Sequence, residues 1–88
     1  HIRLKFSPQR LPYVISKPIH HSQMVENESE GIISLNLIPN KELISELIWF
    51  RDDVEILSPE SLREEIKEII AKMHQKYFGV KKDRTTSL

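Results

Sequence analysis

The segment IHHSQMV, residues 19–25, holds the side chains of this sequence that best suit chemistry. His20 and His21 are adjacent, and Ser22 and Gln23 follow them directly. Imidazole nitrogens are common metal ligands and general bases, and a hydroxyl near a histidine is an arrangement that nucleophilic catalysis uses. Three kinds of site therefore have to be compared: a metal centre, a catalytic centre, and a strand that binds a ligand or a partner.

A metal centre requires several ligands that converge on one point. We expect residues 19–27 to form a strand, on which neighbouring side chains point to opposite faces, so His20 and His21 would not share an ion. His74 lies in a predicted helix with no carboxylate at a metal-binding spacing from it. The sequence has no cysteine, which removes thiolate ligands. We therefore expect no metal and no cofactor.

A catalytic centre is equally poorly supported. No acidic residue stands close to His20 in the sequence to orient its imidazole. The only glycines, Gly31 and Gly79, form neither a nucleophile elbow nor a phosphate-binding loop. We expect a binding domain and not an enzyme, in which His20, Ser22 and Gln23 supply hydrogen-bond donors and acceptors while positive charge comes from residues elsewhere in the sheet.

The composition indicates one small globular domain. The chain has 88 residues, 39% of them hydrophobic and 30% charged, and its net charge is zero. This balance argues against a domain that mainly grips duplex DNA, for which a strongly basic surface is typical. No apolar run is long enough to cross a membrane, so we expect no membrane contact. The chain begins with a strand pattern and without Met, and we expect it to be part of a longer protein.

Alternation and helical spacing predict the elements that would position these side chains. Strands are expected at residues 2–6, 19–27, 31–38 and 54–57, with Gly31 at the end of the hairpin connection between the middle two. Helices are expected after Ser7, after the N-cap Asn40, and over 59–78 with Ser58 as N-cap and Gly79 as C-cap. This order is typical of a ferredoxin-like βαββαβ sandwich of the α+β class, an antiparallel sheet with helices on one face, here with an extra C-terminal helix. Since Ile2, Leu4 and Phe6 would face the helices, Arg3 and Lys5 would share the free face. Residues 79–88 are expected to form a flexible tail.

Two further residues allow both a structural and a functional interpretation. Helical spacing places Phe50 in the core, which leaves Trp49 as an exposed anchor for a neighbouring domain. Arg63, in the first turn of the last helix, is expected either to form an ion pair with Asp52, Asp53 or Glu55 or to bind a ligand. The apolar positions of that helix form one stripe, which is made of Leu62, Ile66, Ile69, Ile70, Met73 and Tyr77.

The run VEILSPESLREEIKEIIAKMHQKY, together with IHHSQ and IRLKFSPQ, resembles the C-terminal extension of WYL-domain transcriptional regulators, the WCX domain. The resemblance covers residues 2–77, so we expect residues 1–78 to form this domain. It includes the small-Pro turn, the following Leu-Arg-Glu, and a His-x-Ser-Gln segment that His20, Ser22 and Gln23 match. The chain departs from the pattern at Phe50-Arg51-Asp52, where a glycine is frequent, and at His21, where a proline is frequent.

The resemblance implies a bacterial, dimeric regulator. An N-terminal helix-turn-helix or winged-helix domain would bind operator DNA, and a central WYL domain would precede this module in the same chain. The two C-terminal domains would together sense an anionic effector such as a nucleic acid or a nucleotide. Residues expected to bind that effector or to contact the WYL domain are Arg3, Lys5, His20, Ser22, Gln23 and Arg63.

Two other functions remain open at this point. The chain could be a purely structural docking or dimerisation domain without a ligand of its own. It could also be a free-standing RNA-binding domain, but such readers stack bases on a pair of aromatic residues in their central strands. Phe6 is the only aromatic residue in any predicted strand, and its phase places it inside.

Overall fold

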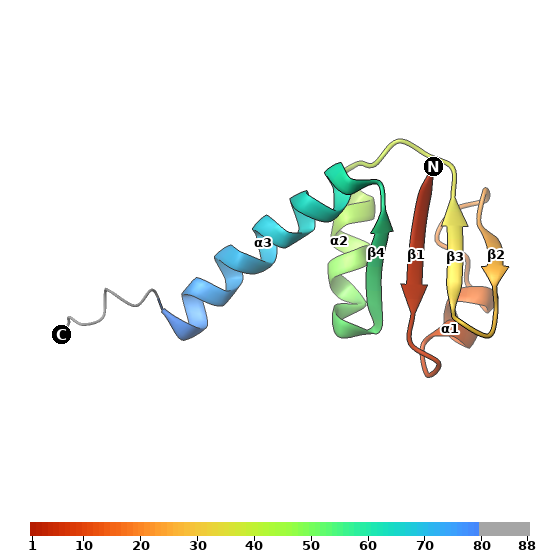
Figure 1. Ribbon diagram of the computed structural model, residues 1–88, viewed down its shortest axis with the longest axis horizontal. Coiled ribbons are helices and arrows are strands. Elements are labelled where there is room, and N and C mark those ends of the chain that lie inside the picture. The colour runs from red at the N-terminus through yellow and green to blue at the C-terminus, as the bar shows by residue number, and fades with distance from the viewer. Residues whose placement is uncertain (80–88) are drawn as a thin grey trace.

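The computed structural model describes residues 1–79 as an antiparallel sheet with helices on one face (Figure 1). The elements are β1 (Ile2–Phe6), α1 (Leu11–Ser16), β2 (Met24–Asn27), β3 (Ile32–Leu35), α2 (Lys41–Trp49), a 3₁₀ turn (Arg51–Asp53), β4 (Val54–Ser58) and α3 (Glu60–Phe78). The four strands lie in the order β2-β3-β1-β4, and every neighbouring pair is antiparallel. This order confirms the predicted ferredoxin-like α+β fold with an extra C-terminal helix.

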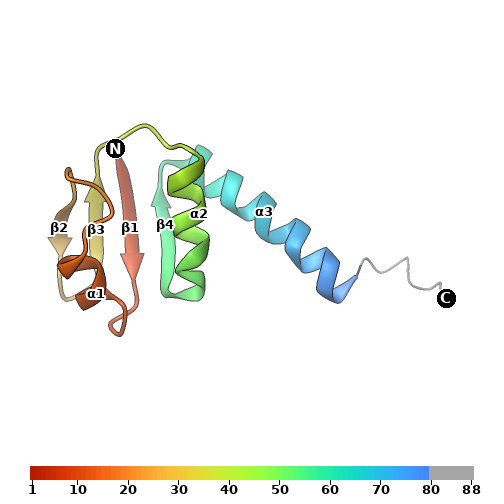
Figure 2. The same cartoon turned by 180° about the vertical axis from the view of Figure 1, so that it is seen from behind.

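The hydrophobic core lies between the sheet and the two shorter helices. Figure 2 shows α1 and α2 in front of the sheet, so both cover the same face and the opposite face stays free of helices. Ile2 pairs with Leu35 and Leu4 pairs with Ile33, so these four side chains point together toward the helices and are almost fully buried. The core consists of Ile2, Leu4, Phe6, Leu11, Val14, Ile33, Leu35, Leu43, Leu47, Phe50, Ile56, Leu62 and Ile66.

The ends of α2 and α3 agree with the predicted capping residues. The side chain of Asn40 accepts a hydrogen bond of 2.8 Å from the backbone N–H of Leu43, which satisfies one free donor of the first turn of α2. Gly79 ends α3 with a φ of 79° and donates its N–H to the carbonyl of Gln75 at 2.8 Å. Both predicted caps are thereby confirmed.

The turn between β2 and β3 depends on Gly31, as the sequence predicted. Gly31 has a φ of 76°, and its carbonyl accepts a hydrogen bond of 2.8 Å from the N–H of Phe6. A Cβ at this position would overlap the carbonyl oxygen of Phe6. Only glycine therefore allows this turn to lie so close to the end of β1.

Arg51 occupies the position at which the family resemblance leads one to expect a glycine. Its φ is 59°, in the left-handed region that favours glycine, and its side chain is exposed. The backbone therefore keeps the tight turn after α2 although the residue type differs. The cost of placing a non-glycine residue in this region is about 1–2 kcal/mol.

Several predicted element boundaries were wrong because local hydrogen bonds override the hydrophobic pattern. The second strand was expected over residues 19–27, but it starts at Met24, and residues 19–23 form turns. The third strand ends at Leu35 and leaves Ile38 86% exposed. The first helix begins at Leu11, after a turn at residues 8–10.

The start of α3 was also predicted incorrectly. Ser58 is the last residue of β4 and pairs with Arg3, so it is not the N-cap of the helix. Pro59 takes the N-cap position and makes no side-chain capping bond. The expected tail, residues 79–88, lies outside the described residues except for Gly79.

The stability of the docked part of α3 can be tested at Ile66, which is 7% exposed. Ile66→Ala should lower the free energy of unfolding by about 2–4 kcal/mol, because it leaves a cavity under the first turns of α3. Ile70→Ala is the matched control, since Ile70 is 54% exposed on the same helix and its truncation should change the unfolding free energy little. Urea denaturation measures both values. Equal unfolding free energies for the two variants would show that α3 is not docked on the body.

Candidate functional site

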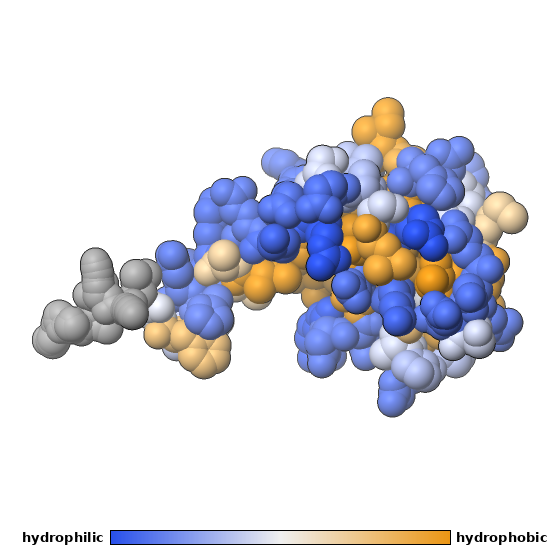
Figure 3. Space-filling view, viewed as in Figure 1, coloured by the Kyte–Doolittle hydropathy of each residue, from blue (hydrophilic) through white to orange (hydrophobic). Residues whose placement is uncertain are grey.

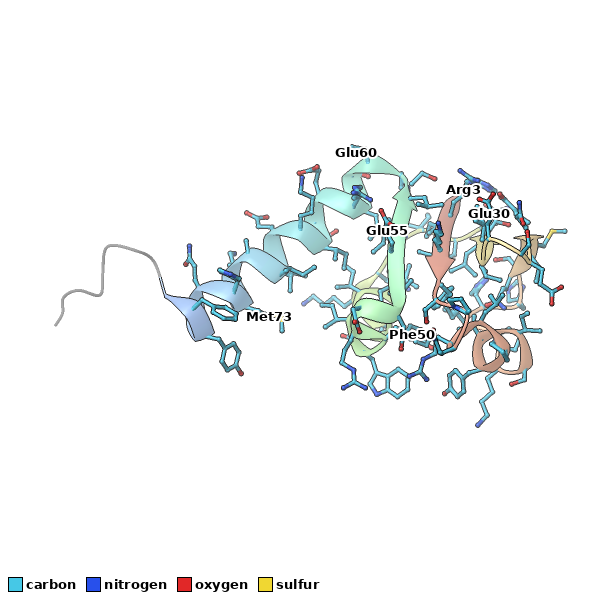
Figure 4. All side chains as sticks on the ribbon, turned by 60° about the horizontal axis from the view of Figure 1, so that its bottom comes forward. Arg3, Glu30, Phe50, Glu55, Glu60 and Met73 are labelled. Carbon is cyan, nitrogen blue, oxygen red and sulfur yellow. The ribbon has the colours of Figure 1, made fainter. Side chains whose placement is uncertain are left out.

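The face of the sheet that no helix covers carries charged side chains from β1, β2 and β4. Arg3 and Lys5 alternate with the buried Ile2 and Leu4, which places both cations on the uncovered face, as predicted. The Nε of Arg3 lies 2.9 Å from Oε1 of Glu26, which lies in β2. Lys5 is exposed and pairs in register with Glu55 of β4. Figure 4 shows Arg3 on β1 and Glu55 on β4.

Arg63 joins the start of α3 to β4 through two contacts. Its Nη1 donates to the carbonyl oxygen of Ile56 at 2.7 Å and lies 3.2 Å from Oε2 of Glu55. Of the three acidic partners considered for Arg63 in the sequence, the structure therefore selects Glu55. Because one of these bonds is to the backbone of β4, Arg63 has a structural role whether or not it also binds a ligand.

The charges of the uncovered face almost balance. This face holds three cations, Arg3, Lys5 and Arg63, and two carboxylates, Glu26 and Glu55. Arg3 pairs with Glu26 and Arg63 pairs with Glu55, so within residues 1–79 Lys5 is the cation of this set that forms no ion pair. Ion pairs that are this exposed contribute little to stability, about 0–1 kcal/mol each. An incoming anion could therefore displace either glutamate at small energetic cost. The face is suited to a modest attraction for anions and not to tight binding by this domain alone.

Gln23 holds the loop between α1 and β2 against α1. Its Nε2 donates to the carbonyl of Val14 at 3.0 Å, and its Oε1 accepts from the N–H of Ile19 at 2.9 Å. Both ends of the side-chain amide are thus used inside the loop. Gln23 points to the helix layer and does not share the uncovered sheet face with Arg3 and Lys5.

His20 and Ser22 fasten the same loop to the end of β3. The backbone N–H of Asn36 donates to Oγ of Ser22 at 2.8 Å, and this hydroxyl lies 2.7 Å from Nδ1 of His20. The N–H of Ser22 donates to the same Nδ1 at 3.2 Å. Since Nδ1 accepts this bond, the neutral imidazole carries its proton on Nε2.

The structure therefore divides the predicted site residues into two groups. Arg3, Lys5 and Arg63 lie at the uncovered sheet face, whereas His20, Ser22 and Gln23 form hydrogen bonds within the loop. Alternation along β1 predicted the positions of Arg3 and Lys5, and Arg63 joins them through its ion pair with Glu55. The second group was assigned to a strand because IHHSQMV resembles one in composition, and the hydrogen bonds of its own side chains produce a turn instead. A binding role for either group stays a prediction.

A cluster around Asp53 that the sequence analysis missed connects the end of β1 to the turn before β4. Oδ1 of Asp53 accepts from Oγ of Ser7 at 2.8 Å, and its Oδ2 lies 3.2 Å from Nε of Arg10. The hydrogen bond from Ser7 is the main cause that lowers the pKa of the Asp53 carboxyl, with Arg10 adding to it. The ionised carboxylate thereby ties two loops together.

The guanidinium of Arg10 also lies close to three aromatic rings, two of which are exposed. It lies 5.3 Å from the ring centroids of both Tyr13 and Trp49 and 5.8 Å from that of Phe50. Tyr13 and Trp49 are 40% and 56% exposed. Trp49 is therefore exposed as predicted, and its aromatic neighbour Tyr13, one helical turn from Arg10, extends the surface that a partner would contact.

The edge of the domain beside this cluster has acidic character. An open depression of about 920 Å³ lies there, between the loop after β1, the β2–β3 turn and the turn before β4. The charged residues that line it are Lys5, Glu28, Glu30, Asp52, Asp53 and Glu55. This excess of carboxylates repels phosphates, so an anionic ligand would approach the uncovered sheet face and not this edge.

Two further structural findings limit the kinds of site that residues 1–79 contain. No group of at least three His, Cys, Asp or Glu side chains in this range is arranged to hold a metal ion. Within the same range, no helix combines the length and the apolar character needed to cross a membrane.

Comparison with protein families gives a match to the WCX domain over residues 1–74, which extends from the start of β1 well into α3. No curated protein and no solved structure matches the chain. The match covers the sheet, both covering helices and the loop fastened by His20, Ser22 and Gln23. It confirms the resemblance that these segments suggested.

The structural role of the α1–β2 loop can be tested by Gln23→Ala. This change leaves the carbonyl of Val14 and the N–H of Ile19 without their partner, so the unfolding free energy should fall by about 1–3 kcal/mol. Gln9→Ala, at an exposed position in the turn before α1, is the matched control. Urea denaturation followed by circular dichroism measures both. If Gln23→Ala unfolds at the same urea concentration as the control, the side chain does not hold the loop.

The contribution of Asp53 depends on pH in a defined direction. Its pKa is lowered by folding, so the stabilisation is complete above the ordinary pKa of an aspartate and is lost as the pH falls through the lowered value. Asp53→Asn should therefore be less stable than the parent chain at pH 7, and its stability should fall less on acidification. Asp52→Asn, at the exposed neighbouring position, is the control. Parallel stability profiles for the parent and Asp53→Asn from pH 7 to pH 2 would contradict this role.

Proposed function

The chain belongs to the WCX domain family, and we propose that it is the C-terminal regulatory module of a WYL-type transcriptional regulator. In this proposal the module binds an anionic, nucleic-acid-like effector together with the WYL domain of the same chain and has no catalytic role. The regulator would act in the cytoplasm as a homodimer and bind operator DNA through an N-terminal helix-turn-helix domain. The observation that carries the proposal is the helix-free sheet face with Arg3 and Lys5 on its central strand.

The shape and charge of this face support a shared effector site. A flat sheet surface with a few cations offers ion pairs to phosphates but no enclosed pocket for a whole ligand. Arg3 can bind a phosphate in the bidentate geometry that its guanidinium favours, once the ligand takes the place of Glu26. The remaining contacts would come from the WYL domain, so the isolated module is expected to bind an effector weakly.

A docking module without a ligand of its own is the second candidate function. It is supported by the ion pairs of Arg3 with Glu26 and of Arg63 with Glu55, which already balance most of the charge on the uncovered face. It is also supported by the exposed aromatic rings of Trp49 and Tyr13, since aromatic residues are enriched at protein interfaces. In this case the same surfaces would hold the WYL domain in place.

Charge reversal at β1 tests the effector proposal. In the full-length regulator, the double change Arg3→Glu and Lys5→Glu should weaken binding of a short single-stranded oligonucleotide about tenfold or more at low salt. The slope of log K against log salt concentration should become shallower by about 0.7 for each phosphate that the variant no longer neutralises. Fluorescence anisotropy over a salt series measures both quantities. Glu26→Gln should change the affinity in the opposite direction, because it removes the ion-pair partner of Arg3.

Lys41→Glu is the control for this experiment, because Lys41 is exposed at the start of α2 in the helix layer. It should leave oligonucleotide affinity unchanged, and operator binding by the N-terminal domain should be the same in all variants. If reversal at Arg3 and Lys5 leaves the affinity unchanged but separates the module from the WYL domain, docking is the function of this face.

A further inference from the structure

Ser34 is a buried polar residue on the face of the sheet that no helix covers. It lies in β3 between Ile33 and Leu35, whose side chains point to the helices, so its own side chain points to the uncovered face. Ser34 is nevertheless only 7% exposed. Within residues 1–79 its hydroxyl makes no hydrogen bond. A buried hydroxyl without a partner is uncommon in folded proteins and requires an explanation.

An ion pair that crosses β3 accounts for the burial of Ser34. Ser34 pairs in register with Arg3 of β1 on one side and with Met24 of β2 on the other. Neighbouring strands lie about 4.8 Å apart, so the ion pair of Arg3 with Glu26 of β2 bridges about 10 Å and passes over β3. Figure 3 views the uncovered face and shows hydrophilic residues around a smaller apolar area.

The backbone of β2 is shaped to bring Glu26 to this position. The pairing of β2 with β3 shifts in register between Val25 and Asn27, so Glu26 is an extra residue without a partner in β3. Such a bulge bends the strand and redirects a side chain. The carboxylate of Glu26 lies where two nitrogen groups converge. Its Oε1 is 2.9 Å from Nε of Arg3, and its Oε2 is 3.6 Å from Nε2 of His1.

The groups around this carboxylate form an anion site that Glu26 itself fills. Arg3 uses only its Nε in the ion pair, and its two Nη groups make no hydrogen bond within the described residues. The two carboxylate oxygens lie near Arg3 and His1, which leaves none for the hydroxyl of Ser34. A phosphate carries additional oxygens in a tetrahedral arrangement, so it can accept from a guanidinium and from a hydroxyl at the same time. The unpartnered hydroxyl therefore fits a phosphate better than it fits Glu26.

The neighbouring side chains favour a phosphate that belongs to a nucleotide. Lys5 follows Arg3 by two residues along β1, about 7 Å away on the same face, and suits the next phosphate of an oligonucleotide. It forms no ion pair within residues 1–79. Met24 is 68% exposed beside Ser34, and its flexible thioether offers an apolar surface for a base.

We propose that Arg3 and Ser34 bind a phosphate group of a nucleotide or an oligonucleotide, and that Glu26 is a lid that closes this site in the absence of the ligand. The incoming phosphate displaces the carboxylate from Arg3, and the uncovered hydroxyl of Ser34 then donates to a phosphate oxygen. Because the ion pair is exposed, the displacement lowers the affinity by a factor of about five at most. The inference rests on the proposed effector site and adds to it a phosphate-binding residue and a competing residue.

Ser34→Ala tests the hydroxyl in the full-length regulator. Fluorescence anisotropy should show that a short oligothymidylate with a terminal phosphate binds about tenfold more weakly, since a hydrogen bond to a charged group is lost. Urea denaturation of the same variant should show unchanged or higher stability, because the hydroxyl has no partner in the ligand-free domain. Ser45→Ala, at an exposed position of α2 in the helix layer, is the matched control and should change neither quantity.

The same oligothymidylate without its terminal phosphate identifies the source of the phosphate. An equal loss of affinity for both oligonucleotides in Ser34→Ala assigns the site to an internal phosphate of the chain. A loss confined to the phosphorylated form assigns it to a terminal phosphate. Either result supports the contact between Ser34 and a phosphate.

Thiol labelling of the 88-residue chain tests the lid without any ligand. The chain has no cysteine, so the thiol introduced by Ser34→Cys is the only one. It should react with iodoacetamide about fivefold faster once Glu26→Ala removes the carboxylate above it, because an exposed ion pair holds the lid closed by about that factor. Glu28→Ala, at an exposed position of the β2–β3 turn, should leave the rate unchanged.

The results separate this inference from the proposed effector site. If Arg3→Glu with Lys5→Glu weakens oligonucleotide binding and Ser34→Ala does not, the effector site stands and the role of Ser34 is wrong. If none of these changes affects binding, both proposals fail. Equal labelling rates with and without Glu26→Ala contradict the lid. A loss of affinity in Ser34→Ala that is matched by an equal loss of stability makes Ser34 a structural residue and overturns the inference.

Discussion

The alternation of side chains along β1 is the constraint on which the rest of the structure depends. This strand is central in the sheet and pairs with both β3 and β4. Its buried residues Ile2, Leu4 and Phe6 are between 0% and 2% exposed and lie on the apolar sheet face that α1 and α2 cover. A shift of its register by one residue would move Arg3 and Lys5 into the core, so hydrophobic burial determines where the cations of the uncovered face lie.

Periodicity predicted the parts of the fold that hydrophobic burial determines. The two covering helices, the central strands and the docked start of α3 follow from spacings of apolar residues, and the caps Asn40 and Gly79 follow from residue type. Residues 19–23 were predicted incorrectly because the amide of Gln23 and the imidazole of His20 bond to the backbone of their own loop. Such bonds depend on contacts that no spacing shows. The cluster of Asp53 with Ser7 and Arg10 escaped prediction for the same reason, since 43 or more residues separate Asp53 from its partners.

The surface charges give the domain two regions of different character although the net charge of the 88-residue chain is zero. The uncovered sheet face has a small excess of cations, whereas the depression at the end of β1 is lined by five carboxylates and Lys5. Lys5 and Glu55 belong to both regions, so the two adjoin each other. The carboxylates of the depression would repel an anion, whereas Arg3 and Lys5 on the uncovered face would attract one. The rings of Trp49 and Tyr13, whose centroids lie 6.2 Å apart, form a separate exposed aromatic surface.

Arg63 physically connects the uncovered sheet face with the first turn of α3. It lies in the first turn of α3, yet it contacts Glu55 on the sheet face and the backbone of Ile56. A ligand that competed with Glu55 for this guanidinium would act on the helical turn whose docking sets the direction of α3. Coupling between two sites requires that each ligand interact differently with the two states of a shared element. Because α3 is docked only at its start, a rotation of that turn would displace the end of the helix, near Tyr77, more than its beginning. The contact of Arg63 with Glu55 is therefore the place at which a ligand on the uncovered face would change the position of α3 relative to the sheet.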